Sequence, residues 1–384
     1  MPISYQEALH IIRTEIQPLH VKQSLPLLKA VNRIASSNVY AKFALPKHPM
    51  SLKEGYGIAF DATTTVYTLL NQPYPETIPL GYGVRLSTGE SIPQGADTII
   101  AEEDILIDKE DRIKIPLQVT QAQHIKKEGE DIAKDELLLK KCERISAQKI
   151  TALSSQGIIR VKAFQKPTIS ILSIGTQLAS GEIHNSNAMS LAARVIELGG
   201  KVGEIVICEE DETKILTTLK LLIQKADCVI TTGALSRHDT MRHLLETKML
   251  MPLFHQVRIA PAKPSSLTLV ENKPILHLPG LPLGCMLGFE MLGVPLLRQL
   301  QHQLCIIPDF ITCVNQKQIT CKDNCMSAIP GYSDGRNFVN APYYEAGRLN
   351  ILSQCNGYTL VEDKEMIEEG ELIPFFYFTH PPVS

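Results

Sequence analysis

The chain has 384 residues, of which 44% are hydrophobic and 21% are charged. This composition is typical of a folded globular protein and excludes the disordered and coiled-coil classes. The formal net charge of −3 provides no general positive field, so nucleic-acid binding would need a local basic patch. The length exceeds what a single hydrophobic core usually serves and predicts two to four domains.

The N-terminal residues have no basic segment followed by an apolar one, and no apolar run approaches the ~18 residues that span a bilayer. We therefore expect a cytoplasmic protein without membrane contact. Nine cysteines, an odd number, favour reduced thiols over a disulfide framework. A zinc site near Cys321 and Cys325 is conceivable, but no second Cys or His pair stands at zinc-finger spacing, and isolated thiols are the alternative.

In chain order, a capping box at Ser4–Glu7 opens an amphipathic helix. Residues 39–139 then alternate short β-type runs (98–101, 105–107 and 112–115) with Pro and Gly turns, which predicts a small β domain. A second helical stretch, 147–155, ends at Gly157.

From residue 166 to 304 the pattern is that of an α/β domain. Nearly continuous apolar strands are expected at 168–174, 202–207, 228–232, 266–270 and 275–278, and helices between them at 188–198, 213–225, 241–248 and 283–300. Such strands predict a mainly parallel sheet covered by helices on both faces, with ligands beyond the carboxyl ends of the strands. The rest of the chain returns to short β-type runs (310–314, 350–352, 358–361 and 372–378) and predicts an all-β module.

Three glycine loops follow predicted strands: Ser173-Ile-Gly175, Thr232-Gly233-Ala-Leu-Ser236 and Leu278-Pro279-Gly280-Leu-Pro282. Glycine lets a ligand approach the backbone, and the N–H groups at the following helix start favour an anion such as phosphate. Because all three loops are expected at one edge of the sheet, they predict a phosphate-bearing ligand in one crevice. The alternative is three ordinary tight turns.

Charged residues near these loops allow two interpretations each. Lys263, held between two prolines, could bind a phosphate or be a solvated lysine. Asp239 could bind Mg²⁺ or cap the helix that follows it. Glu54 and Asp131 lie beside turn glycines in the β region, where charged residues are usually solvated.

Together these loops resemble the molybdopterin molybdenumtransferase family, which includes MoeA and the gephyrin E domain. Residues 46–57, 86–102 and 181–187 are similar to family segments, and residues 125–132 resemble its Ile-Arg-x-x-Gly-Glu-Asp-Ile signature. The loops at Gly233, Lys263 and Gly280 stand in the family order. The resemblance covers essentially the whole chain.

The resemblance implies an elongated homodimer of four-domain subunits. It assigns residues 1–38 and 140–165 to a helical dimerisation domain, 39–139 to an inserted β domain, 166–304 to a doubly wound molybdopterin-binding α/β domain, and 305–384 to a C-terminal β barrel. The implied activity is the Mg²⁺-dependent insertion of molybdate into adenylylated molybdopterin with release of AMP. The implied partners are a second copy, the molybdopterin ligand and other proteins of molybdenum cofactor biosynthesis.

The resemblance also implies roles for individual residues. It makes Glu54, Asp131 and Asp239 the catalytic residues and the Mg²⁺ ligands, in a crevice between the α/β domain of one subunit and the β domain of the other. It assigns substrate binding to Ser51, Thr88, Gly89, Ser173, Gly175, Asn187, Gly233, Ser236, Lys263, Pro279, Gly280 and Pro282.

Several positions depart from the family pattern, and most departures replace a polar or charged residue. Thr176 and Gln177 stand in place of two acids, Met241 in place of a third, and Leu281 in place of an asparagine. Each lost charge-assisted hydrogen bond would cost about 1.5–3 kcal/mol. Two hypotheses follow: a working transferase with an altered site, or a catalytically degenerate paralogue that serves as a dimeric scaffold or binds a partner or altered ligand.

Overall fold

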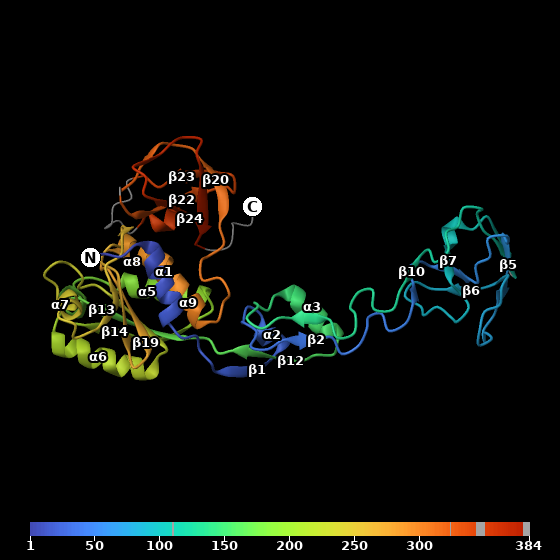
Figure 1. Cartoon of the computed structure of the whole chain (residues 1–384), viewed down its shortest axis with the longest axis horizontal. Coiled ribbons are helices and arrows are strands. Elements are labelled where there is room, and N and C mark those ends of the chain that lie inside the picture. Colours follow the sequence, from blue (N-terminus) through green and yellow to red (C-terminus); the bar gives the residue numbers. More distant parts are fainter. Residues whose placement is uncertain (110, 323, 343–349, 379–384) are drawn as a thin grey trace.

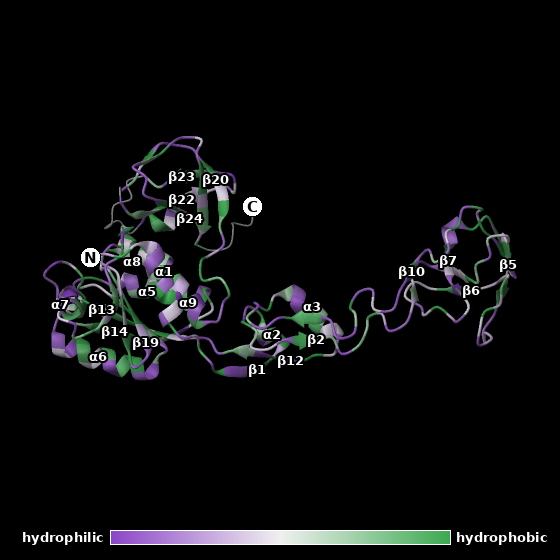
Figure 2. Ribbon diagram, in the orientation of Figure 1, coloured by the Kyte–Doolittle hydropathy of each residue, from purple (hydrophilic) through white to green (hydrophobic). Residues whose placement is uncertain are grey.

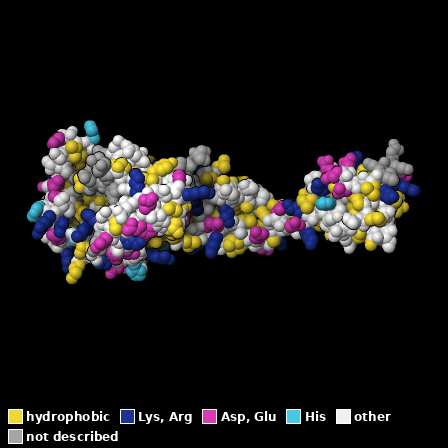
Figure 3. All heavy atoms as spheres, turned by 90° about the horizontal axis from the view of Figure 1, so that it is seen from above, with side chains coloured by type: hydrophobic (Ala, Val, Ile, Leu, Met, Phe, Trp, Pro, Cys, Tyr) yellow, Lys and Arg dark blue, Asp and Glu magenta, His cyan; other side chains and the backbone are white. Residues whose placement is uncertain are grey.

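The computed structural model describes residues 1–109, 111–322, 324–342 and 350–378. The molecule is elongated (Figure 1). An α/β domain and a C-terminal β barrel lie at one end, a small central segment follows, and a β domain lies at the far end. The β domain is joined to the rest by a narrow neck, which the space-filling view shows clearly (Figure 3).

The α/β domain is built on a six-stranded sheet whose strand order is β14-β13-β15-β19-β18-β16. The first four strands are parallel, while β18 and β16 are antiparallel additions at one edge. The strands are β13 (Thr168–Ile174), β14 (Lys201–Cys208), β15 (Cys228–Thr232), β16 (Pro252–His255), β18 (Ser266–Val270) and β19 (Lys273–Leu278). The prediction of a mainly parallel sheet is confirmed, and the antiparallel edge strand β16 was not anticipated.

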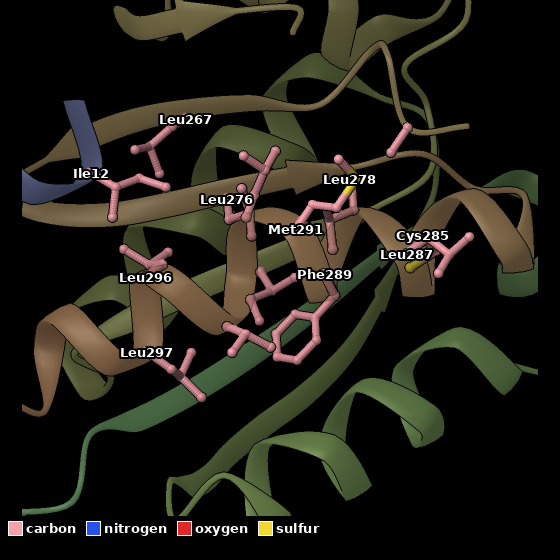
Figure 4. Packing of buried hydrophobic residues seen from close by; sticks show 14 of the residues in the cluster. Ile12, Leu267, Leu276, Leu278, Cys285, Leu287, Phe289, Met291, Leu296 and Leu297 are labelled. Carbon is pink, nitrogen blue, oxygen red and sulfur yellow. The ribbon is translucent and has the colours of Figure 1, made fainter. Parts of the chain in front are cut away.

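Helices cover both faces of this sheet because its strands are apolar on both sides. One face packs against α5 and a continuous helical run, and the other against α6 and α7. The helices are α4 (Thr176–Ala179), α5 (Ser186–Glu197), α6 (Glu212–Lys225), α7 (Thr240–Glu246), α8 (Pro282–Gly288), the π-helical η2 (Phe289–Gly293) and α9 (Val294–Leu300). Figure 4 shows the core between the sheet and the run from α8 to α9.

The run Pro282–Leu300 is the one described helix that is long and apolar enough to cross a membrane. Within the structure, 83% of this stretch is buried. Its side chains pack against Leu276 and Leu278 of the sheet (Figure 4). It is the core helix of the α/β domain.

The N-terminal helix α1 (Tyr5–Glu15) corrects one predicted domain boundary. Ser4 and Glu7 form the expected capping box. However, the apolar stripe of α1, including Leu9 and Ile12, belongs to the core of the α/β domain, and α1 contacts α9. The assignment of residues 1–38 as a whole to the helical dimerisation domain is therefore wrong for α1, because its buried face needs the larger core.

The C-terminal module is a closed barrel of five strands, as expected. Its order is β22-β23-β20-β26-β24, and β24 pairs back onto β22. The elements are β20 (Ile311–Asn315), β21 (Ile319–Thr320), β22 (Met326–Ser333), β23 (Asn337–Asn340), η3 (Leu352–Gln354), β24 (Gly357–Glu362), β25 (Met366–Ile367) and β26 (Leu372–Tyr377). The β-type run expected at 350–352 is wrong, since Leu352 begins a 3-10 helix. Strand β17 (Ile259–Ala260) pairs with β22 and ties the barrel to the α/β domain.

The central segment is built from two antiparallel strand pairs, β1 with β12 and β2 with β11, around two helices. Strand β1, largely hydrophilic in Figure 2, lies on its surface. The elements are β1 (Lys22–Pro26), α2 (Leu27–Ala30), β2 (Val39–Tyr40), β11 (Leu137–Leu139), α3 (Ala147–Ser155) and β12 (Arg160–Phe164). Helix α3 starts and ends as predicted, with a Ser146 cap and a left-handed Gly157.

The β domain contains a six-stranded sheet in the order β7-β4-β6-β5-β9-β8 and a separate pair, β10 with β3. Its elements are β3 (Met50–Ser51), β4 (Gly55–Ile58), β5 (Val66–Leu70), β6 (Tyr82–Leu86), β7 (Thr98–Ala101), η1 (Glu102–Asp104), β8 (Ile107–Lys109), β9 (Arg112–Lys114) and β10 (Ile125–Lys126). The strand expected at 105–107 begins two residues later, at Ile107. Its other expected strands at 98–101 and 112–115 are present.

Candidate functional site

The three glycine loops meet at the carboxyl ends of the parallel strands and enclose a crevice. Its volume is ≈ 1050 Å³, which is enough for a ligand larger than most drug-sized molecules. The predicted site residues that line it are Gly175, Asn187, Gly233, Ser236, Asp239, Pro279, Gly280 and Pro282. The structure therefore brings the α/β half of the predicted site together.

Glycine is required where two of these loops pass close to neighbouring backbone. Gly233 has φ +98°, and a Cβ added to it would lie 2.3 Å from the carbonyl oxygen of Ile174. A Cβ on Gly280 would lie 3.2 Å from the Cα of Gly233. The loops thus approach each other more closely than side chains would permit, which explains both glycines.

Two long helices begin at the crevice without a side-chain cap. Asn185 precedes α5 and Leu281 precedes the run Pro282–Leu300, and neither side chain caps its helix, although both residues line the crevice. By contrast, Ser4 and Ser146 cap α1 and α3 with their hydroxyls. The first N–H groups of the two uncapped helices are therefore left for an anionic ligand, which the helix dipoles also favour.

Asp239 stands at the start of α7 but does not cap it. Its Oδ2 accepts a hydrogen bond of 2.7 Å from the backbone N–H of Ser236 and so closes the loop. Asp239 lines the crevice, and its second carboxylate oxygen is not engaged by this bond. The helix-cap role is therefore not observed, and the carboxylate is held at the crevice, where the Mg²⁺ role stays a prediction.

Two further carboxylates that were not predicted as site residues also line the crevice. Glu182 accepts a hydrogen bond of 3.0 Å from the amide of Gln177, and Glu210 follows the end of β14. A signal was available for Glu210, because it follows the carboxyl end of β14, but not for Glu182, which follows the helix α4. They supply negative charge near the positions where Thr176 and Gln177 replace two acids of the family pattern.

Positive charge is scarce in this half of the site. Among the described residues that line the crevice there is no Lys or Arg. Lys263 is exposed and lies outside the lining, although its neighbours Pro261 and Pro264 belong to it. A cation that faces a bound phosphate could come from Lys263, from Arg237 in the loop between Ser236 and Asp239, from a metal ion or from another chain.

Two predicted substrate contacts are instead committed to the protein itself. Ser173 is fully buried, and its hydroxyl donates to Oδ1 of Asn185 at 2.8 Å. The amide nitrogen of Asn187 donates both of its hydrogens, to Thr232 at 3.2 Å and to the carbonyl of Gly280 at 2.8 Å. These two side chains position the crevice walls.

The remaining predicted residues form a second group in the β domain. Ser51 is buried, and its backbone exchanges hydrogen bonds with the turn that contains Thr88 and Gly89. Asp131 is exposed and pairs with Lys126 at 2.6 Å, on the strand that adjoins Ser51. Glu54 is exposed and lies one residue before β4.

The two groups are far apart within one chain. The crevice lies in the α/β domain, whereas β10, which carries Lys126, lies at the opposite end of the molecule (Figure 1). No group of three His, Cys, Asp or Glu side chains among the described residues could hold a metal ion. Glu54, Asp131 and Asp239 thus form no three-carboxylate site in a single copy. Among the described residues, Cys321 and Cys325 likewise belong to no group of three such side chains. All nine cysteines are free of disulfides, as expected.

Comparison with known proteins supports the resemblance. A model of the MoeA N-terminal region (domain I and II) matches residues 3–157, and a model of a probable molybdopterin binding domain matches residues 170–299. The molybdopterin molybdenumtransferase of Haemophilus influenzae is 27% identical over 295 residues, which are 73% of each chain. That of Staphylococcus aureus is 25% identical over 340 residues, 83% of this chain and 81% of the relative.

The fold is shared with a solved structure. The crystal structure of the molybdopterin biosynthesis MoeA protein from Pyrococcus horikoshii matches with a TM-score of 0.86, at 22% sequence identity, over 98% of this chain and 100% of the other. The two family models follow each other along the chain in the order of the domains described above. The chain belongs to the MoeA family.

Proposed function

We propose that this protein is a molybdopterin molybdenumtransferase that acts in molybdenum cofactor biosynthesis. In this reaction molybdate is inserted into adenylylated molybdopterin, and the phosphoanhydride bond breaks as AMP leaves. The membership of the family and the names of its relatives support the proposal. The names of these relatives do not favour the alternative of a degenerate scaffold.

The observation that carries the proposal is the crevice itself. Three glycine loops and two helix starts without a side-chain cap surround ≈ 1050 Å³. Backbone N–H groups fixed in this way are suited to phosphate oxygens, and they need no rearrangement when charge develops as a phosphoanhydride breaks. The close approach of Gly233 and Gly280 keeps the walls rigid. We expect the pyrophosphate of the substrate to lie against these groups.

The proposal includes Mg²⁺ but assigns it no complete set of ligands within one chain. Its candidate ligands Glu54, Asp131 and Asp239 do not come together within one chain, and one oxygen of Asp131 is paired with Lys126. Carboxylates are suitable ligands for this ion, which usually binds together with substrate phosphates. When bound, it would neutralise charge on the pyrophosphate.

A homodimer completes the proposed site. If the β domain of a second copy approaches the crevice, Glu54, Asp131 and Lys126 of that copy supply the acids and the cation that one α/β domain lacks. Other proteins of molybdenum cofactor biosynthesis remain proposed partners, and the cytoplasm remains the proposed location. No contact with nucleic acid or membrane is part of the proposal.

The experiment that tests this function measures AMP released from adenylylated molybdopterin by the purified protein. Reactions with and without molybdate and Mg²⁺ are compared, and a relative with known activity serves as the positive control in the same buffer. Molybdate-stimulated release that requires the protein is the expected result. No release, while the control enzyme turns over, would contradict the proposal and support the scaffold hypothesis.

A further inference from the structure

One hydroxyl group connects several elements that line the crevice. Thr232, the last residue of β15, is buried, and its Oγ1 donates to the carbonyl oxygen of Pro279 at 3.1 Å. The same oxygen accepts from the amide of Asn187 at 3.2 Å and from the thiol of Cys285 at 3.4 Å. A hydroxyl offers one donor and two acceptor positions, so this group is fully used.

Each bond of this hydroxyl reaches a different element. Asn187 comes from the first turn of α5, Pro279 from the loop after β19, and Cys285 from the first turn of α8. Asn187 uses its second hydrogen to bind the carbonyl of Gly280, so it spans both loops. One strand end, one loop and two helix starts are therefore connected through Thr232.

The spacing of the glycine loops depends on this network. The backbone N–H of Gly233, the residue after Thr232, donates to the carbonyl of Leu278 at 3.1 Å. Gly280 packs directly against Gly233. A shift of Thr232 relative to Pro279 would therefore change the distance between the two loops that face the ligand.

The thiol is suited to a permanent donor role. Cys285 is fully buried at the start of the core helix (Figure 4), and burial raises the pKa of its thiol to about 12. It therefore stays protonated at physiological pH and can donate to Thr232.

We propose that Thr232, Asn187 and Cys285 form a hydrogen-bonded latch that holds the crevice in its ligand-binding shape, with Thr232 as a positioning residue for the proposed reaction. The latch touches the walls rather than the reacting atoms. The expected effect of the latch on catalysis rests on the proposed function, whereas its structural role rests on the hydrogen bonds alone.

The test replaces the hydroxyl by a methyl group of the same size, in Thr232→Val. A misplacement of positioning groups by a fraction of an ångström to 1 Å lowers kcat/KM by on the order of tenfold to a hundredfold. We expect that loss, mainly through a higher KM for adenylylated molybdopterin, measured by AMP release. Thr232→Ser keeps the hydroxyl and is expected to retain the wild-type KM.

Thr231→Val is the matched control. Thr231 is the preceding residue of the same strand, is equally buried, and its hydroxyl also makes a hydrogen bond, of 2.9 Å to Nδ1 of His277, but it faces away from the crevice. We expect its KM to be unchanged. An equal rise in KM for Thr231→Val and Thr232→Val would overturn the latch, because it would show a general effect of losing a buried hydroxyl.

A second readout does not depend on the reaction. Amide hydrogen exchange without substrate is followed in peptides that contain residues 232–236 and 279–285. Faster exchange at the Gly233 amide is expected in Thr232→Val and in Asn187→Ala, but not in Thr231→Val, since only the first two release the loops. Because the latch acts as a unit, the double variant should exchange about as fast as the faster single variant.

The two readouts separate the two proposals. If the wild-type protein releases no AMP but Thr232→Val still loosens both peptides, the proposed function fails and the latch stands. If the wild type turns over and Thr232→Val matches Thr231→Val in KM and in exchange, the latch is overturned. If Thr232→Val does not fold, Asn187→Ala is measured in its place. Unchanged hydrogen exchange and an unchanged KM in Asn187→Ala would overturn the latch.

Discussion

The two halves of the proposed site differ in how their polar groups are used. In the α/β domain, Ser173, Asn187, Thr232 and Asp239 all make hydrogen bonds within the chain, and these bonds fix the crevice. In the β domain, Glu54 and Asp131 are exposed. The first half is a preformed cavity, and the second presents charge on a surface. The difference suggests that one half defines the shape and the other delivers charge.

The neck between the halves supports this division. Its two chain segments run side by side, with Leu45 bridged to Ile132 and the N–H of Gly129 bonded to the carbonyl of Pro46. The neck is thus a paired ribbon rather than two loose linkers. A paired ribbon can hold the β domain at a distance from its own crevice and within reach of another.

The largest effect is expected from a substitution in the preformed crevice of the α/β domain. In Gly233→Ala, the new Cβ would clash with the carbonyl of Ile174 at 2.3 Å, in a backbone conformation with φ +98°. We expect a loss of about 2–4 kcal/mol in the free energy of unfolding and loss of AMP release. The free energy of unfolding is measured by urea unfolding followed by circular dichroism.

Two other glycines are the controls for this clash. Gly181, also in the α/β domain, has φ +79° and no atom within 4 Å of an added Cβ, and Gly89 in the β domain has φ +83° and only the end of Met50 nearby. Alanine at either should cost roughly 1 kcal/mol, from the left-handed backbone alone. Equal losses at Gly233 and Gly181 would show that the contact with Ile174 is unimportant.

The next expected effect tests whether the α/β domain of one chain and the β domain of another form one site. Asp239→Asn alters the crevice and Asp131→Asn alters the β domain, and each is expected to lower turnover at least about a hundredfold when alone. If the site is shared between copies, unfolding and refolding the two variants together at equal concentration creates mixed dimers with one intact site. About a quarter of wild-type activity should return, because half of the dimers are mixed and each has one site of two.

The mixing experiment has a clear contrary outcome. No recovery in the mixture, with mixed dimers demonstrated by differently tagged chains, would mean that both acids act within one chain. Asp111→Asn, at an exposed turn beside β9, is the control for charge loss in the β domain and should keep full turnover. The stability of Asp131→Asn should fall by less than about 1 kcal/mol, because its ion pair with Lys126 is exposed.

A third prediction concerns a titratable group buried in the sheet that supports the crevice. His277 lies between the hydroxyls of Thr231 and Thr268, and burial lowers its pKa to about 3. The unfolded state has the ordinary value near 6.5, so its stabilising contribution is complete above pH 6.5 and is lost as pH falls towards 3. Between pH 7 and pH 5 the wild type should therefore lose about 2 kcal/mol that His277→Gln does not. Parallel pH profiles of urea midpoints would contradict this.

Much of the α/β framework could be predicted from the sequence. Strands Thr168–Ile174 and Cys228–Thr232 were predicted with their observed bounds, because each is a continuous apolar run with a clear break at its end. The strand Pro252–His255 was not, since it is short, begins with proline and lies at an antiparallel edge. The run 350–352 looked like a strand only because three residues carry too little periodicity to distinguish helix from strand.

The candidate site was predictable in position but less so in detail. Glycine spacing at strand ends located the crevice. The direction of the side chains could not be predicted from this spacing. Ser173 lies on a strand at the site, yet its side chain points into the protein and is fully buried. Glu210 could have been found from its place after β14, but Glu182 could not, because a single sequence does not show which loop residues turn towards a crevice.

The smallest expected effect concerns the residue after Gly233. Ala234 adopts φ +56°, in the left-handed region that favours glycine. The strain of this conformation in alanine, about 1–2 kcal/mol, exceeds the ~0.4–1 kcal/mol that alanine gains over glycine by restricting the unfolded chain. Ala234→Gly should therefore stabilise the protein by roughly 0.5 kcal/mol, seen as a small rise in the urea midpoint. A fall in the midpoint would instead mean that the greater conformational freedom of glycine in the unfolded chain outweighs the strain that it relieves.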